Sequence, residues 1–240
     1  MLGPLVFFQR RFHQELQGVL LLVTRRLEIT IVVFSILFFP GVLLHEISHW
    51  LMAKVLRVQT GGISLVPRAT KDGQLQMGYV LTEKADIFRD ALIGFAPLLT
   101  GGLFVGYAGT KKLGLLILWD AVLTMEIAPV MMAIERLLTQ PDFWLWFYMT
   151  LVVSSTMLPS PADRRAWLPL LLMAALLIGT GVFLGVGPFI QDALIVPLNK
   201  AFRAIAVVLA ISTGVHGFVL LPFWGVRKLL CWLTGLQVVA

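Results

Sequence analysis

The feature that most restricts the fold is a series of long apolar segments separated by short polar stretches. Measured against a membrane hydrocarbon core of about 30 Å, five of these segments are candidate spans: 27–52, 91–109, 143–158, 167–187 and 201–225. The chain is 58% hydrophobic and 13% charged, which leaves too few charged residues to cover a soluble globule of 240 residues. The sequence therefore predicts an all-α polytopic membrane protein with about five to six transmembrane helices.

The charge pattern indicates a membrane environment and argues against nucleic acid as a partner. The net charge is +6, and many basic residues occur as pairs between the apolar runs: Arg10-Arg11, Arg25-Arg26, Lys111-Lys112, Arg164-Arg165 and Arg227-Lys228. Pairs in such places are typical of helix ends that contact lipid headgroups. A nucleic-acid surface would need a continuous basic face, which is not seen. The single cysteine, Cys231, excludes an internal disulfide and a cysteine-based zinc site.

The polar stretch after the first span predicts a short β-hairpin at about 62–82. Apolar and polar residues alternate on both sides of Lys71-Asp72-Gly73, a tripeptide suited to a turn. We expect this hairpin to lie at or slightly within the membrane interface. Residues 1–26 are expected to form an interfacial amphipathic segment and not a signal peptide.

The motif HEISH, residues 45–49, is the strongest chemical signal in the sequence. On a helix, His45 and His49 lie on one face and can hold the same metal ion, while Glu46 lies beside it as a general base. In zinc hydrolases of this type the metal lowers the pKa of a bound water, and the glutamate accepts the proton. Three ionisable residues within an apolar span are costly, so they need a shared reason. We expect His45 and His49 to bind Zn²⁺ and Glu46 to be catalytic.

A catalytic zinc site needs a third protein ligand, and the candidates are Asp163, Glu126, Asp120 and His216. Asp163 follows an apolar span in the segment TMLPSPADRR, where two prolines prevent the helix from continuing. We expect an extended, kinked segment there that turns the Asp163 carboxylate inward, and we favour it over Glu126 and Asp120. We expect His216, which lies between two glycines, to be a packed and hydrogen-bonded histidine.

The choice of Asp163 depends on how the apolar run 113–137 is arranged. If this run crossed the membrane once, Asp163 would emerge on the side opposite His45 and His49. We therefore expect 113–137 to be interfacial, re-entrant or bent at Pro129. The alternative is that it crosses and that Glu126 or Asp120 supplies the third ligand.

These motifs together resemble the site-2 protease family of intramembrane zinc metalloproteases. The resemblance rests on HEISH in a transmembrane helix, the hairpin that follows, the stretch IGFAPLLTGG (93–102) and Pro-Ser-Pro-Ala-Asp (159–163) after a later helix. It covers roughly residues 30–165. The sequence has Ala162-Asp163-Arg164 where the family has Leu-Asp-Gly, and Ser155 or Thr156 where the family has an asparagine.

The resemblance implies a membrane-embedded metalloprotease core at 27–166. The C-terminal transmembrane helices that we expect at 167–240 lie outside the resemblance and are predicted from their apolar runs. The resemblance further implies a zinc metalloendopeptidase that cleaves transmembrane or membrane-proximal segments of other membrane proteins. It also implies a multi-pass protein of the cell membrane whose active site faces the cytosol. The basic residues do not predict this orientation, because the two sides carry similar numbers of Lys and Arg. The alternative is a non-catalytic membrane adaptor that retains a metal site, a reading favoured by the altered Asp163 motif.

Overall fold

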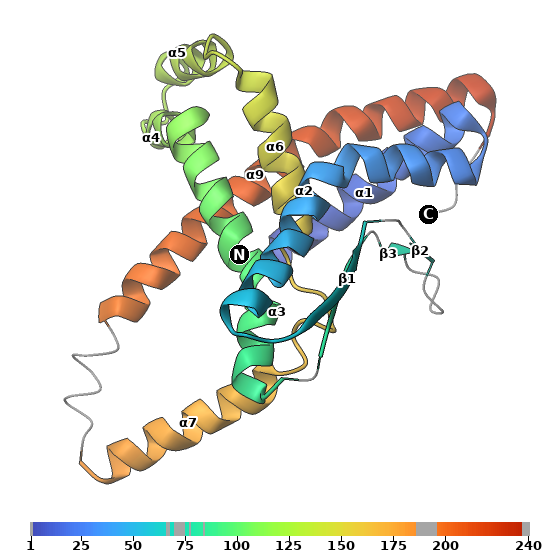
Figure 1. Cartoon of the computed structure of the whole chain (residues 1–240). Coiled ribbons are helices and arrows are strands. Elements are labelled where there is room, and N and C mark those ends of the chain that lie inside the picture. The colour runs from blue at the N-terminus through green and yellow to red at the C-terminus, as the bar shows by residue number, and fades with distance from the viewer. Residues whose placement is uncertain are drawn as a thin grey trace. The chain divides into compact units, whose positions relative to one another are not determined.

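The computed structural model describes residues 2–65, 68–69, 75–76, 78–83, 85–185 and 196–236, which are mostly helical (Figure 1). The helices are α1 (Leu2–Thr24), α2 (Leu27–Val55), α3 (Ile87–Tyr107), α4 (Leu115–Leu123), α5 (Ile127–Leu138), α6 (Phe143–Thr156), α7 (Trp167–Phe183) and α9 (Val196–Thr234). A short π-helical turn, η1 (Ala108–Lys112), extends α3.

Three helices in the described part of the chain are long and apolar enough to cross a membrane. They cover Leu27–Val55, Ile87–Lys112 and Pro197–Thr234. The predicted spans 143–158 and 167–187 form helices of 14 and 17 residues, which at 1.5 Å per residue rise only about 21 and 25 Å. The prediction of an all-α membrane protein is confirmed, but the structure has fewer full-length spans than the five to six predicted.

The apolar run 113–137 forms two short helices, α4 and α5, rather than one continuous helix. The break falls at Thr124–Glu126, where Met125 has a positive φ of 58°. Pro129 lies in the first turn of α5, a position that suits proline because the first N–H groups of a helix have no intrahelical partner. The expected interruption is therefore present, but it precedes Pro129.

The predicted hairpin is present as antiparallel pairs of strands. Strand β1 (Thr60–Ser64) pairs with β4 (Tyr79–Thr82), and Ile63 lies opposite Val80. Strand β2 (Arg68–Ala69) pairs with β3 (Leu75–Gln76). The turn predicted at Lys71-Asp72-Gly73 lies outside the described residues.

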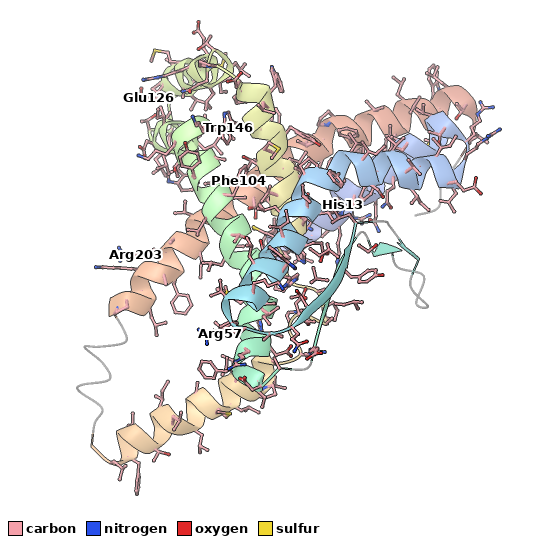
Figure 2. The ribbon with its side chains drawn as sticks, viewed as in Figure 1. His13, Arg57, Phe104, Glu126, Trp146 and Arg203 are labelled. Carbon is pink, nitrogen blue, oxygen red and sulfur yellow. The ribbon has the colours of Figure 1, made fainter. Side chains whose placement is uncertain are left out.

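The chain divides into two compact units, which we describe separately. The first comprises 1–41, 103–155 and 208–240, and the second comprises 42–102 and 156–207. In the first unit α1 packs against the beginning of α2, where the rings of Phe12 and Phe38 have centroids 6.4 Å apart (Figure 1). Phe104 and Trp146 pack within the same unit with centroids 6.1 Å apart (Figure 2). The interfacial position expected for residues 1–26 stays a prediction.

The first unit also contains His216, which is fully buried. Its Nε2 lies 2.8 Å from the Ser155 hydroxyl and its Nδ1 lies 2.7 Å from the carbonyl oxygen of Ser212. The prediction that His216 is a packed, hydrogen-bonded histidine is confirmed.

In the second unit the sequence determines where α3 begins and where α6 ends. The Asp86 carboxylate accepts hydrogen bonds from the backbone N–H groups of Phe88 and Arg89, both at 3.1 Å, and so caps α3. Helix α6 ends at Thr156, shortly before Pro159 and Pro161, as predicted. The following residues form a series of turns over 161–166, however, and not the extended segment that we expected.

Candidate metal centre

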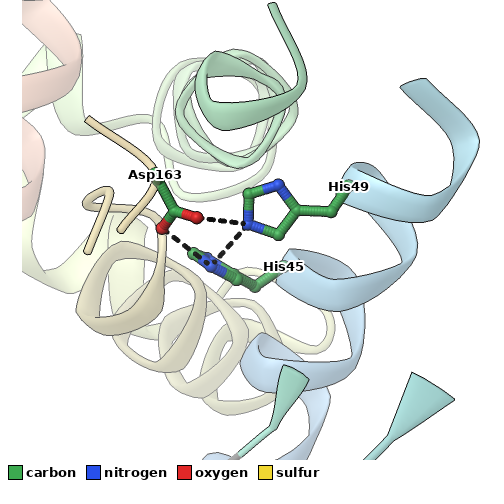
Figure 3. A group of neighbouring side chains, drawn as sticks. All are labelled: His45, His49 and Asp163. Carbon is green, nitrogen blue, oxygen red and sulfur yellow. Dashed lines mark hydrogen bonds and ion pairs between the residues drawn. The ribbon is translucent and has the colours of Figure 1, made fainter. Parts of the chain in front are cut away.

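His45 and His49 lie one helical turn apart on α2, so their rings project from the same face (Figure 3). The two Nε2 atoms are 3.2 Å apart and the ring centroids are 4.8 Å apart. The histidine pair thus has the convergent arrangement that the HEISH spacing predicted.

The Asp163 carboxylate approaches this pair from the segment that follows α6 (Figure 3). Its Oδ1 lies 3.3 Å from His49 Nε2 and its Oδ2 lies 3.9 Å from His45 Nε2. A local turn holds the carboxylate, because the Ser160 N–H donates to Oδ2 at 2.7 Å and the Asp163 N–H donates to the Ser160 hydroxyl at 3.3 Å. The ligand atoms of His45, His49 and Asp163 all lie within 4.8 Å of one another, so the group could hold a metal ion.

The hydrogen bonds of the two imidazoles determine which ring nitrogen faces this group. His45 Nδ1 lies 2.7 Å from the Thr156 carbonyl oxygen, and His49 Nδ1 lies 2.8 Å from the Ile93 carbonyl oxygen. A carbonyl can only accept, so this network assigns a proton to each Nδ1. In the neutral imidazoles both Nε2 atoms then carry a lone pair directed at the group.

Three electron-rich ligand groups, each largely shielded from solvent, therefore converge. Lone pairs at such separations repel one another unless a cation lies among them. Two of the three separations, 3.2 and 3.3 Å, are close to the spacing of roughly 3.4 Å between ligand atoms around a tetrahedral zinc ion with bonds near 2.1 Å. The third, between His45 Nε2 and Asp163 Oδ2, is 3.9 Å. Histidines that bind a metal through Nε2 also donate Nδ1–H to a carbonyl or carboxylate in most sites. The residues present thus fit a divalent metal ion.

The rival ligands are not part of this group. Asp120, in α4, and Glu126, directly before α5, are both exposed and belong to the first unit. In the described residues, the one set of three or more His, Cys, Asp or Glu side chains close enough to share a metal ion is His45, His49 and Asp163.

Glu46 lies next to the histidines on α2 and is buried. Its neighbour from the hairpin is Gly78, which directly precedes β4 and is also buried. A Cβ atom added at Gly78 would lie 2.9 Å from both Cγ and Oε1 of Glu46. The backbone before β4 therefore covers the side chain to which the sequence assigns the role of base.

Helix α3 supports the centre through two glycines and a threonine. A Cβ added at Gly94 would lie 2.0 Å from the Asp163 carbonyl oxygen, and one at Gly101 would lie 2.5 Å from Met157 Cβ. The Thr100 hydroxyl lies 2.5 Å from that of Ser48, which is on α2 between the two histidines. Sequence reasoning missed these supporting contacts, although Gly94 and Gly101 are seven residues apart and so share a helix face.

An ion pair ties the segment after Asp163 to the first turn of α3. Arg165 donates through Nε and Nη2 to the two carboxylate oxygens of Asp90, each at 2.7 Å. The hydrogen bonds and charge of Asp90 raise the pKa of the Arg165 guanidinium above its already high usual value. A raised pKa in a basic group means that its contribution to stability is lost only as pH rises through that value. Arg165 therefore stays charged at every pH at which the protein would be assayed.

The fold and the site together define a helical membrane protein with a candidate metal centre made of two histidines and an aspartate. Comparisons with protein-family models, curated proteins and solved structures gave no match. The resemblance to site-2 proteases accordingly rests on the residues themselves.

Proposed function

We propose that the protein is an intramembrane zinc metalloendopeptidase of the site-2 protease type. The observation that carries this proposal is the convergence of His45 Nε2, His49 Nε2 and the Asp163 carboxylate, with the Glu46 carboxyl on the same helix. Ionisable groups within an apolar helix are costly, and a shared catalytic metal accounts for His45, Glu46 and His49 together. The same metal accounts for the approach of the Asp163 carboxylate to the two histidines.

Each side chain has a distinct role in this proposal. His45, His49 and Asp163 hold the ion. A bound zinc ion would supply Lewis acidity, making water a better nucleophile and the scissile carbonyl a better electrophile. Glu46 accepts the proton of the attacking water and later donates it to the leaving amine.

The substrate in this proposal is a transmembrane or membrane-proximal segment of another membrane protein. Two of the three residues of the candidate centre, His45 and His49, lie on a helix that is itself long and apolar enough to cross the bilayer, which supports a substrate from the same environment. A helical substrate must unwind locally before attack, since its carbonyls are engaged in intrahelical hydrogen bonds. The hairpin strands β1 and β4 are placed in the same unit as the centre and could pair with the unwound chain.

The substitution Glu46→Gln tests the proposal, because it keeps the shape of the side chain and removes the base. We expect the variant to retain zinc and to cleave about 10²- to 10⁴-fold more slowly, the usual contribution of a general base. The measurement compares the new N-termini of membrane proteins in cells that produce the wild-type or the variant chain, together with the zinc content of each purified protein. New N-termini that are equally abundant in both cells, with zinc bound in both proteins, would contradict catalysis and favour the non-catalytic adaptor.

A further inference from the structure

The hydrogen bond that orients His49 ends on a carbonyl in the middle of a helix. His49 Nδ1 lies 2.8 Å from the Ile93 carbonyl oxygen, and Ile93 belongs to α3, which extends from Ile87 to Tyr107. A carbonyl inside an α-helix normally accepts the N–H of the residue four positions later. Such a carbonyl can take a second donor from a neighbouring helix, as the Leu37 carbonyl of α2 does from the Tyr148 hydroxyl, but that donor then shares the oxygen with the helical N–H.

The residue four positions after Ile93 is Pro97, which lies inside α3. Proline has no backbone N–H, so α3 provides no donor at that position for the Ile93 carbonyl. Ile93 and His49 are each only 7% exposed, so neither the carbonyl nor the imidazole N–H has ready access to water. An unsatisfied polar group in such a setting is costly, and each of these two groups satisfies the other.

The two histidines obtain their carbonyl partners in different ways. His45 Nδ1 faces the carbonyl oxygen of Thr156, the last residue of α6. The last carbonyl groups of any α-helix receive no N–H from within the helix, so they can accept other donors. His49 faces the interior of α3, where no helix end is available. A proline four residues further on is the simplest way to present a carbonyl from the side of a continuous helix.

We infer that Pro97 is a positioning residue of the metal centre. By leaving the Ile93 carbonyl without a helical donor, it fixes the Nδ1–H tautomer and the ring orientation of His49. The Nε2 lone pair of His49 is thereby directed toward Asp163 Oδ1, 3.3 Å away, and His45 Nε2, 3.2 Å away. This inference rests on the proposed metal centre. Pro97 acts through its missing backbone N–H and not through a contact of its ring with the metal centre.

The substitution Pro97→Ala tests this inference, because alanine brings an N–H that competes with His49 for the Ile93 carbonyl. We expect the affinity for zinc to fall about 10- to 100-fold, the usual effect of losing the partner of a metal-binding histidine. The measurement is a competition titration with a chromogenic chelator on the full chain in detergent. Cobalt binding, followed through its visible absorption bands, reports the coordination geometry independently of activity.

If Pro97 served only to stabilise the fold, the metal-free Pro97→Ala protein would unfold at a lower temperature than the wild type. We expect it to unfold at the same temperature or higher, because alanine is a far better helix former than proline. Pro222 lies inside α9 and provides the matched control. We expect Pro222→Ala to leave both zinc affinity and the cobalt spectrum unchanged.

The decisive comparison replaces residue 97 by lactic acid, the α-hydroxy analogue of alanine. The resulting backbone ester has the alanine side chain but no N–H, and we expect it to restore zinc affinity to within a few-fold of the wild type. Wild-type affinity in Pro97→Ala, or equal affinity in the alanine and ester variants, would overturn the inference. Failure of the wild-type chain to bind zinc or cobalt would instead overturn the proposed metal centre, and the role of Pro97 with it.

Discussion

At the scale of single residues, Gly78 shows how closely the hairpin approaches the proposed base. A Cβ at this position would lie 2.9 Å from the Glu46 carboxylate oxygen Oε1, closer than real Cβ atoms come to other atoms. Gly78→Ala should therefore displace Glu46, to which the three nearest atoms all belong, rather than His45, His49 or Asp163. A displacement of about 1 Å in a catalytic group can slow a reaction on the order of 100-fold.

We accordingly expect Gly78→Ala to slow cleavage on this scale while zinc affinity stays unchanged. The measurement is the rate at which a substrate identified by N-terminal profiling is cut, next to a zinc titration. Gly62 in β1 supplies the control, because a Cβ there meets nothing within 4 Å. Cleavage by Gly78→Ala at the wild-type rate would show that Glu46 does not depend on this contact.

The residues that hold the metal centre were largely predictable, and their partners were not. His45, Glu46 and His49 follow from a local spacing, because helix geometry alone places them together. Asp163 was favoured over Glu126 and Asp120 because prolines end α6 before it, and the structure brings its carboxylate to the histidines. The carbonyl groups of Ile93 and Thr156 could not be foreseen, since a backbone acceptor carries no residue-specific signal.

At the scale of elements, α3 is the support on which the centre is built. Its Ile93 carbonyl holds His49, its Gly94 admits the backbone of Asp163, and its Thr100 is bonded to Ser48 on α2. The contacts of Gly94 and Thr100 depend on a small and a polar side chain, in a helix whose other residues have the composition of a membrane span.

The substitution Gly94→Ala tests this packing. The added Cβ would lie 2.0 Å from the Asp163 carbonyl oxygen, so either α3 or the segment that carries Asp163 must shift. We expect zinc affinity to fall by at least about tenfold and the melting temperature to fall as well, because both depend on that close approach. A zinc titration and a thermal melt of the purified protein measure the two effects.

Gly106, on the same helix, is the matched control. A Cβ there makes an ordinary contact of 3.5 Å with Val208 Cγ2, and alanine is favoured over glycine within a helix by about 1 kcal/mol. Gly106→Ala should keep zinc affinity and melt no earlier than the wild type. Equal behaviour of the two alanine variants would mean that α3 does not position Asp163.

Element boundaries explain where the sequence-based fold departs from the structure. The apolar run 113–137 was expected to be interfacial, re-entrant or bent at Pro129. The chain instead breaks at Met125, and Pro129 lies in the first turn of α5. Hydrophobicity alone also overestimated two spans, because α6 and α7 are mostly apolar but stop at 14 and 17 residues. Composition predicts where a segment lies more readily than where its helix ends.

At the scale of the whole molecule, the class of protein follows from composition and the site from a few residues within it. Three long apolar helices mark a membrane protein, and the strand pairing between β1 and β4 matches the predicted hairpin. The division into two units was not predictable, because α2, α3, α6 and α9 each contribute residues to both. All three ligands of the candidate centre nonetheless belong to a single unit.

The measurement that tests the account most directly is the zinc content of the full chain, purified in detergent without added metal, for the wild type and for Asp163→Asn. The account predicts about one zinc ion per wild-type chain and a loss of zinc affinity of at least about 100-fold when the Asp163 charge is removed. Asp120→Asn and Glu126→Gln should bind zinc as the wild type does. A wild-type chain without zinc, or zinc that survives in Asp163→Asn but is lost in Glu126→Gln, would contradict the central claim.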